Sequence, residues 1–450
     1  MIHLSDLYRY FSFITLGLVA SSGHAAGLLE LYQQALGHDP RFQAEYHEKL
    51  ARDERYYQAR AALLPQVAMY ARASQIGQNI VSSDNQVFGS GSTRYPTTVY
   101  GLSLTQSVYD YSRWAVLRQA DVEIQLAGAE LEIANQGLML RVAEKYLESL
   151  SYYENLSFLQ AEKRQLQANY ELVRARRQDG LAREVEALDA EARLLRVEAR
   201  ELELTDLLRD VLNALGEMTG GVPEQLRLMP EQLALEQPTP SVLEPWLELA
   251  RENNPRLQAA ILQRSIMEQE DKVRKGSYYP TVDLQLSYED DKTEGSLFGG
   301  GSQVQTQAIR LSVNVPLYAG GLNSSRIREV RQRIESTRAK EMQVRSEIER
   351  EVQTAHRFVT TAMARERALR GSLMASERIA QTRKIEFESG LTRLTDLLDA
   401  ERELFFARSE LAGARYDYLM GLLRLKHAAG VLQIDDIQLV DGMLREGIAL

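Results

Sequence analysis

The residues best suited to chemistry form no recognisable catalytic or metal site. The six histidines, His3, His24, His38, His47, His356 and His427, lack the close spacing of a metal-binding motif. Cysteine is absent, which excludes disulfides and thiol-based metal or redox centres. The sequence also lacks a nucleophile motif and a phosphate-binding loop. We therefore expect no enzyme activity, no cofactor and no metal.

A pair of carboxylates, Asp396 and Asp399, is the best candidate for a functional charge. The two residues are three positions apart on a predicted helix, so their side chains share one face. Such a pair usually belongs to a solvated helix surface. If symmetry gathered several copies around a narrow pore, however, the carboxylates would form a ring that favours cations. Their role therefore depends on the elements that hold them.

Composition predicts a helical, exported protein. The chain has 450 residues, only 11 prolines and a net charge of -10, which argues against binding to nucleic acid. Residues 1–26 resemble a secretory signal peptide, with Arg9, a short apolar core and small residues before Gly27. No later window is apolar enough for a membrane helix, so a membrane-inserted form would require a β-barrel.

The chain is an internal duplication. Residues 38–44 (HDPRFQA) recur as 253–259 (NNPRLQA), residues 178–181 (QDGL) recur as 388–391 (ESGL), and Gly220 matches Gly430. We expect a first repeat over 27–220, an equatorial linker over 221–240, a second repeat over 241–430 and a C-terminal equatorial segment over 431–450. Each repeat begins with a helix of about 35 residues, Leu28 to Leu63 or Val242 to Ser277, that ends near a proline.

Two strands are predicted next in each repeat. Val282, Leu284, Leu286 and Tyr288 alternate with polar residues, as do Ile309, Leu311, Val313 and Val315. The first repeat shows the same alternation at Tyr100, Leu102 and Leu104. Polar loops are expected over 82–96 and 290–303. Tyrosines at the strand ends suit an aromatic girdle at a membrane surface: Tyr95, Tyr100, Tyr278, Tyr279 and Tyr288.

Long coiled-coil helices complete each repeat. Leu181, Leu188, Leu195 and Leu202 follow a seven-residue grid, and a similar grid runs from Leu397 to Leu425. The stretch from Tyr109 to Gly180 predicts about 105 Å of helix, which exceeds the need of a globular bundle. Four strands in one chain cannot close a membrane barrel, so we expect more than one copy.

In this order, the motifs resemble the TolC family of outer-membrane channel-tunnels. Residues 104–114 (LTQSVYDYSRW) and 315–321 (VPLYAGG) are similar to its strand-to-helix junctions, and residues 390–399 (GLTRLTDLLD) to its inner-coil tip. The resemblance implies an α+β membrane protein: a homotrimeric 12-stranded β-barrel, with four strands per protomer, continued by a long antiparallel α-helical coiled-coil tunnel through the periplasm.

The resemblance also implies roles for residues near the tip. Asp396 and Asp399 match the acidic ring at the tunnel entrance. Positions of the family's gate contacts fall on Glu186, Phe387 and Thr392, with an arginine one place along at Arg393. Phenylalanine lacks the hydroxyl of the family's tyrosine, so the family's hydrogen bonds cannot be transferred, and Glu186 with Arg393 could equally be a surface ion pair. The tip turns Gly180-Leu181 and Gly390-Leu391 match the docking positions for an adaptor.

The resemblance implies an exit duct in a Gram-negative outer membrane. Its partners would be outer-membrane lipid, a periplasmic adaptor (membrane fusion protein) and an inner-membrane ABC or RND transporter. The absence of a lipidation cysteine favours type I protein secretion over the acylated efflux branch. Multidrug efflux is the alternative, and a periplasmic coiled-coil adaptor, a scaffold or a periplasmic enzyme is a weaker one. The cargo cannot be read from the sequence.

Overall fold

The expected duplication organises the whole structure. A computed structural model describes residues 26–82, 91–223, 225–230, 235–296 and 299–449, so the predicted signal peptide lies almost entirely outside the described residues. The first repeat comprises α1 (Leu28–His38), α2 (Pro40–Ala61), β1 (Gln66–Ile80), β2 (Gly91–Tyr109), α3 (Tyr111–Gln178) and α4 (Glu184–Thr219). The second comprises α5 (Leu243–Asn253), α6 (Pro255–Gly276), β4 (Thr281–Ser296), β5 (Gly299–Asn314), α7 (Leu322–Glu388) and α8 (Leu394–Ala428).

A smaller equatorial unit joins the two repeats. Strand β3 (Gln225–Leu228) lies in the predicted linker and pairs antiparallel with β6 (Arg445–Ala449), which follows α9 (Ile434–Gly442). The main core gathers at this level, where Tyr146, Trp246, Leu419 and Ile437 are buried. None of the helices in the described part of the chain is long and apolar enough to cross a membrane.

The predicted helices of about 35 residues are each broken in two, which corrects the expectation. Asp39 and Asn254 precede Pro40 and Pro255 and adopt extended backbone, as residues before proline prefer. Each then caps the next helix: Asp39 Oδ1 accepts from the backbone N–H of Arg41 at 3.2 Å. Asn254 Oδ1 accepts from the N–H of Arg256 at 2.9 Å. Asp39-Pro40 and Asn254-Pro255, which lie in the repeated motif, therefore each form an elbow between two helices.

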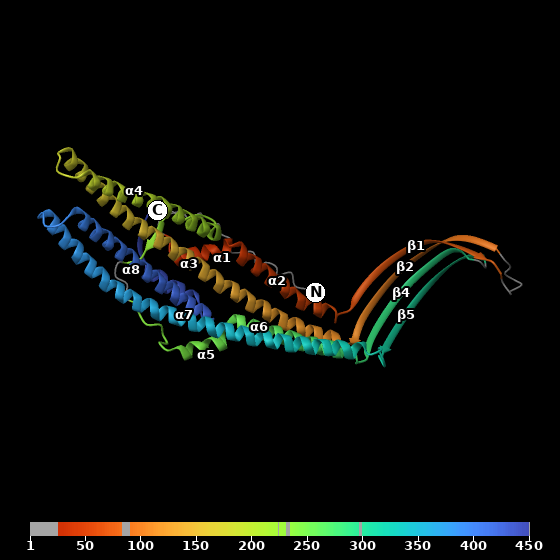
Figure 1. The fold of residues 1–450 in the computed structure, drawn as a ribbon. Helices are drawn as coiled ribbons and strands as arrows, with labels where there is room; N and C mark the ends of the chain where they lie inside the picture. The colour runs from red at the N-terminus through yellow and green to blue at the C-terminus, as the bar shows by residue number, and fades with distance from the viewer. Residues whose placement is uncertain (1–25, 83–90, 224, 231–234, 297–298, 450) are drawn as a thin grey trace.

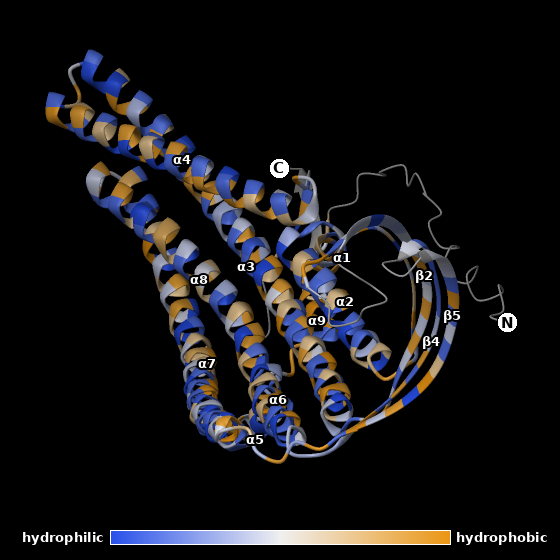
Figure 2. Ribbon diagram, turned by 90° about the vertical axis from the view of Figure 1, so that its right-hand side faces the viewer, coloured by the Kyte–Doolittle hydropathy of each residue, from blue (hydrophilic) through white to orange (hydrophobic). Residues whose placement is uncertain are grey.

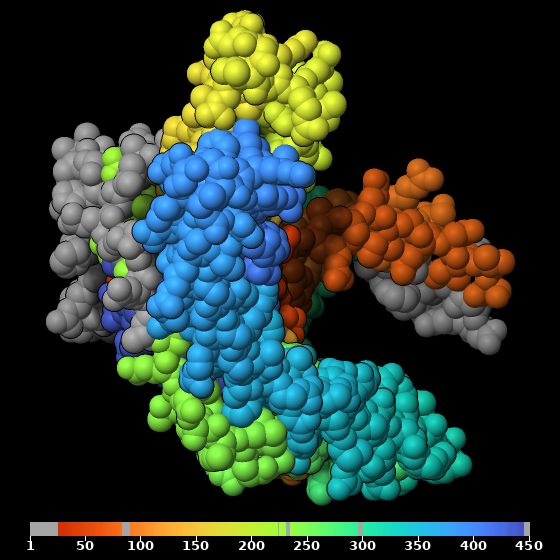
Figure 3. Space-filling view, turned by 60° about the vertical axis from the view of Figure 1, so that its left-hand side comes forward, coloured from red at the N-terminus to blue at the C-terminus, as the bar shows by residue number. Residues whose placement is uncertain are grey.

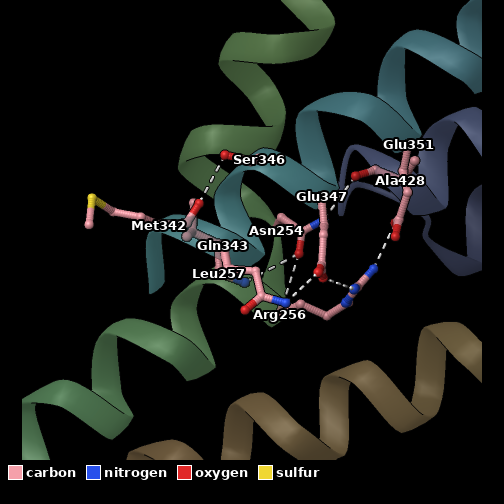
Figure 4. Close-up of polar contacts among 9 residues, drawn as sticks. All are labelled: Asn254, Arg256, Leu257, Met342, Gln343, Ser346, Glu347, Glu351 and Ala428. Carbon is pink, nitrogen blue, oxygen red and sulfur yellow. Dashed lines mark hydrogen bonds and ion pairs between the residues drawn. The ribbon is translucent and has the colours of Figure 1, made fainter. Parts of the chain in front are cut away.

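Each elbow packs on a glycine and is tied to a long helix. Gly220 lies against His38, and Gly430 lies against the backbone of Asn254, whose side-chain amide donates to the carbonyl of Ala428. In the first repeat Asp39 pairs with Arg141 of α3. In the second repeat the charges are reversed, because Arg256 pairs with Glu351 of α7 at 2.7 Å (Figure 4). The elbow residues of the two ties are not equivalent, since Arg256 corresponds to Arg41, but Arg141 and Glu351 are equivalent helix positions with opposite charges.

The long helices have the predicted length. Helix α3 runs unbroken for 68 residues and α7 for 67, which is about 100 Å each at 1.5 Å per residue. Figure 1 shows both helices extending from the sheet to the opposite end of the molecule. On the sheet side they pack in the order α2, α3, α6, α7; on the far side the order is α4, α3, α8, α7.

This single layer leaves two edges within the described chain. One edge is formed by α2 and α4, and the other by α7 alone. The leucines predicted to form a coiled-coil grid on α4 are exposed in the protomer, Leu195 by 56%. Helix α4 instead packs on α3 through Ala190, Val197, Leu204 and Val211, another seven-residue grid. Exposed apolar side chains occur on α2 (Tyr46, Leu50, Tyr57), on α4 (Leu188, Leu195, Leu202) and on α7 (Met342, Met374, Ile379).

The four long strands form one antiparallel sheet in the order β1-β2-β4-β5. The described parts of the predicted polar loops are mostly strand, which corrects the sequence analysis: β2 begins at Gly91, β4 continues to Ser296 and β5 begins at Gly299. Residues 83–90 and 297–298 of these loops lie outside the described residues. These segments were predicted to be loops because their side chains are polar. Asp290 and Gln303, for example, hydrogen bond to each other across the two strands instead of forming a loop.

The register separates an apolar and a polar face. Leu104 pairs with Val67 and Leu286, and Leu286 pairs with Ile309, so these alternating residues share one side. The opposite side carries Thr97, Val99, Ser107, Glu289 and Arg310, and the first three are buried. The sheet bows strongly (Figure 2). Side chains crowd together on the inner side of a bowed sheet, so the face with the buried residues is the concave one. The apolar face is therefore convex. Tyr95 pairs with Ile76 on the concave side, so it does not belong to a girdle with Tyr100 and Tyr288.

Candidate functional site

The end of the molecule farthest from the sheet carries every sequence-predicted site residue. It consists of two helical hairpins, α3–α4 and α7–α8, each closed by a short turn (Figure 1). In Figure 3 the α7–α8 hairpin, in blue, lies against the base of the α3–α4 tip, in yellow. We call this end the tip and the face between the two hairpins the seam.

Both tip turns have the same geometry. Gly180 and Gly390 each have a φ of 72°, the left-handed region that glycine adopts without strain. The N–H groups of Leu181 and Leu391 each donate to a carbonyl five residues back at 2.8 Å, which closes the end of the helix. The two leucine side chains are exposed by 77% and 79%. The predicted chain reversal at glycine is confirmed, and each turn presents one apolar side chain.

The acidic residues after each turn close the start of a helix. Glu186 accepts from the backbone N–H of Arg183 at 3.4 Å and pairs with its guanidinium at 2.8 Å. Asp396 accepts from the backbone N–H of Arg393 at 3.4 Å and from the Thr392 hydroxyl at 3.0 Å. The hydrogen bond from Arg183 lowers the pKa of Glu186, and the charge of Arg393 lowers it further. The hydrogen bonds of these four predicted site residues therefore stay within their own hairpins, and only the charge of Arg393 acts across to Glu186.

Phe387 makes a contact across the seam. The guanidinium carbon of Arg176, near the end of α3, lies 5.8 Å from the centroid of the Phe387 ring on α7. A cation over an aromatic face is attracted by the electron density of the ring. Phe387 therefore links the hairpins without a hydroxyl group.

Asp399 forms an ion pair between the hairpins near the tip. Arg193 on α4 approaches Asp399 of α8 with its Nη1 atom 2.6 Å from Oδ1, and its Nε atom lies 3.0 Å from Asp189. The Arg193 side chain is only 17% exposed, so its charge is largely removed from water except at these partners. Asp399 therefore faces a cation in the protomer, whereas Asp396 caps a helix.

Sequence reasoning missed Arg193. Asp189 and Asp399 are equivalent in the two repeats, since each lies nine residues after a tip glycine. Their equivalence could have indicated a residue such as Arg193, because two carboxylates that lie close together at the seam attract a shared cation. Arg193 itself has no counterpart, and its repeat-equivalent position holds Glu403.

The seam continues below the tip as a mixed apolar and polar contact. Leu166, Val197 and Leu398 form a small buried cluster from three helices. Beside it, Gln165 of α3 donates to Glu401 of α8 at 3.0 Å, while the other carboxylate oxygen of Glu401 is buried without a partner. Burial raises the pKa of Glu401, against the opposing effects of Lys384 and the Gln165 hydrogen bond. Burial likewise raises the pKa of Glu162, against the charge of Arg402.

These carboxyl groups predict a pH dependence of the seam. Because their pKa is raised in the packed state, the seam is most stable below the ordinary value of 4.5 and weakens as pH rises through the raised pKa. We expect acidification to favour packed hairpins and, in the tunnel that the sequence resemblance implies, to lower conductance through the tip. In the variant Glu162→Gln/Glu401→Gln, conductance should be low at neutral pH and nearly independent of pH. Single-channel recordings at neutral and acidic pH measure this.

Glu403→Gln is the matched control for this prediction, because Glu403 is an exposed carboxylate on the same helix. It should keep the wild-type pH profile. Unchanged pH dependence in the double glutamine variant would contradict the role of the buried pair.

Comparison with known proteins agrees with this architecture. A family model described as outer membrane efflux protein matches residues 31–221 and 246–431. The chain is 27% identical to the outer membrane protein TolC of Vibrio cholerae, over 98% of this chain and 99% of that protein. It is 26% identical to the alkaline protease secretion protein AprF of Pseudomonas aeruginosa, over 94% and 88% of the two chains.

A solved structure shares the fold. The CmeC outer membrane channel of Campylobacter jejuni superimposes with a TM-score of 0.77 at 15% identity, over 92% of this chain and 89% of that one. The low identity shows that the arrangement of helices and strands is retained while most side chains differ.

Proposed function

This chain belongs to the outer membrane efflux protein family, and we propose that three copies of it close into one continuous export duct. It is an exit channel of the outer membrane. In the proposed trimer, four strands from each copy give a barrel of 3 × 4 = 12 strands. The long helices of the three copies then form a tunnel below the barrel.

The open edges of the protomer are the observation that carries this proposal. Strands β1 and β5, of 15 and 16 residues, each have one free edge within the described chain. Such edges are costly in lipid, because their backbone groups find no hydrogen-bond partner there. The helical layer is open on the same two sides, at α2 with α4 and at α7. In a closed ring of copies, β1 of one copy would pair with β5 of the next, and the open edges of their helical layers would pack together.

The two faces of the sheet suit the same arrangement. The convex face carries Leu102, Leu104, Leu286, Ile309 and Leu311, which would face lipid in a closed barrel. The concave face is rich in serine, threonine and charged side chains and would line water. Two copies would give eight strands and almost no lumen, so a trimer is the smallest assembly that leaves a pore.

We propose protein export by type I secretion as the main activity. One relative is named an alkaline protease secretion protein, and another a proteases secretion protein from Dickeya chrysanthemi, at 27% identity. The partners would be a periplasmic adaptor, docking at Gly180-Leu181 and Gly390-Leu391, and an inner-membrane ABC transporter. The exposed leucines of the two tip turns support such docking. Efflux of small molecules with an RND transporter is the second candidate, supported by the family description.

Asp396 and Asp399 would contribute six carboxylates to the entrance of the trimer. In the protomer Asp399 is paired with Arg193, so the negative charge of the ring is partly masked while the hairpins are packed. Separation of the hairpins would release Asp399 and make the opening entrance more attractive to cations. Of the candidate gate contacts, Phe387 would link the two hairpins through Arg176, and Arg393 would attract Glu186 across the seam. Thr392 would act by positioning Asp396.

The exposed leucine row on α4 gives a direct test of assembly. Leu195→Glu places a charge on the proposed contact with the neighbouring α7, and we expect folded protomers that no longer trimerise. Burying one leucine is worth about 1.5–3 kcal/mol, and three copies would lose it together. Size-exclusion chromatography with light scattering in detergent measures the mass.

The control for this test is Arg200→Ala, since Arg200 pairs with Glu203 of its own helix, at 2.6 Å. It should remain trimeric. A wild-type protein recovered as a monomer, or from inner membrane or soluble periplasm, would reject the duct in favour of an adaptor or a scaffold.

A further inference from the structure

The convex face of the sheet changes character partway along the strands. Near the helices its side chains are mainly apolar, with Gln106 opposite Leu284 as an exception, and this part ends at Tyr288. From the level of Tyr100, which pairs with Asp290, the register places four polar side chains on β4 and β5: Asp290, Lys292, Gln303 and Gln305. We call these four residues the amide patch.

The amide patch is held together by its own hydrogen bonds. The side-chain NH2 group of Gln303 donates to both oxygens of Asp290, at 2.8 and 3.0 Å. The NH2 group of Gln305 donates to Asp290 at 3.1 Å. These bonds use both N–H donors of Gln303 and one of Gln305, and leave the two carbonyl oxygens free to accept from other partners. Lys292 pairs in register with Gln303 and is exposed, which adds a cation beside the acceptors.

The position of the patch fixes what surrounds it in the proposed barrel. Lys292 lies four residues beyond Tyr288, which is about 13 Å along a strand and somewhat less along a tilted barrel axis. Tyrosine prefers the boundary between hydrocarbon and headgroups. The patch therefore lies at headgroup depth on the outer side of the membrane, facing outward.

From this position and chemistry we propose that the amide patch binds the phosphorylated sugar headgroup of lipopolysaccharide in the outer leaflet. The inference rests on the proposed barrel. Amide oxygens accept hydrogen bonds from sugar hydroxyls, and the ammonium group of Lys292 pairs with phosphate. Asp290 acts as a positioning residue that holds the two amides. A simple phospholipid offers the phosphate without the sugar hydroxyls, so it uses only part of the patch.

The test compares the full-length protein with a triple variant, Lys292→Ala/Gln303→Ala/Gln305→Ala. The matched control is Ser302→Ala/Thr306→Ala, which alters the opposite face of the same strand. Purified lipopolysaccharide and, separately, phosphatidylglycerol are added to each protein in detergent. Native mass spectrometry then counts the bound lipids, and heating measures the temperature at which the oligomer dissociates.

We expect the wild type and the control to retain lipopolysaccharide in preference to phosphatidylglycerol and to dissociate at a higher temperature when it is present. The triple variant should bind lipopolysaccharide about tenfold more weakly, through loss of two amide contacts and one charge. Equal binding by the triple variant, or a wild-type preference for phosphatidylglycerol, would overturn the inference.

A second measurement distinguishes a failure of this inference from a failure of the proposed function. Each protein is also reconstituted into phospholipid vesicles and tested for insertion and conductance. Insertion without selective lipopolysaccharide binding rejects only the amide patch. Failure of the wild type to insert rejects the barrel itself.

Discussion

Replacing Arg193 by alanine is expected to open the tip. The variant removes the cation on α4 that pairs with Asp399 of α8 across the seam and with Asp189 of its own helix. A half-exposed ion pair is worth about 0.5–1 kcal/mol, so three pairs broken together in a trimer shift the ratio of open to closed channels about tenfold to a hundredfold. Single-channel conductance in planar bilayers should rise accordingly.

Ion selectivity distinguishes this account from a general loosening of the tip. Arg193→Ala leaves Asp399 unpaired, so the open variant should be more selective for cations than the wild type. Asp399→Asn should also raise conductance, but with weaker cation selectivity. The double variant should conduct no more than either single variant, because both remove the same contact.

Arg200→Ala serves as the control on α4, since it breaks a surface ion pair that does not reach α8. Its conductance should equal that of the wild type. If Arg193→Ala behaves in the same way as this control, the Arg193–Asp399 pair does not hold the hairpins together.

Gly430→Ala is expected to cause the largest loss of stability. Gly430 has a φ of 73°, and an added Cβ atom would lie 2.3 Å from Cα of Asn254. Because the obstructing atom belongs to the backbone of the elbow, no side-chain rotation relieves the contact. Left-handed backbone adds about 1–2 kcal/mol for alanine, so we expect a total loss of about 2–4 kcal/mol per protomer.

Thermal or urea unfolding of the purified protein measures this loss. Gly413→Ala in α8 is the matched control, because nothing lies within 4 Å of its added Cβ atom and alanine favours a helix. Gly220→Ala should be intermediate, because the nearest obstacle there is the His38 ring, which can rotate away. Equal stability of the Gly430 and Gly413 variants would contradict the elbow contact.

The sequence was sufficient for the repeats, the length of the long helices and the positions of the strands. These features follow from patterns within each segment: the seven-residue grid, two-residue alternation and glycine at the turns. The elbows at Asp39 and Asn254 were missed, although Pro40 and Pro255 were visible, because apolar periodicity continues across both breaks. The extent of the strands was underestimated because Asp290, Lys292 and Gln303 are polar residues that usually indicate a loop.

The tip was predicted only in part, because its contacts join segments far apart in the chain. Asp399 was selected for its spacing from Asp396, but its partner Arg193 lies 206 residues away. Glu186 and Arg393 were considered as a possible clamp, yet each is held mainly by residues of its own turn. The leucine row predicted on α4 is exposed in the protomer, and its proposed partner is the α7 helix of a neighbouring copy.

Comparison of the secreted proteins of a deletion strain with those of its parent tests the central claim most directly. If the chain is an exit duct for protein secretion, deletion should remove one or a few large proteins from the medium, and the intact gene should restore them. Loss of drug resistance with an unchanged set of secreted proteins would instead support small-molecule efflux. If neither secretion nor drug resistance changes, the chain is not an export duct.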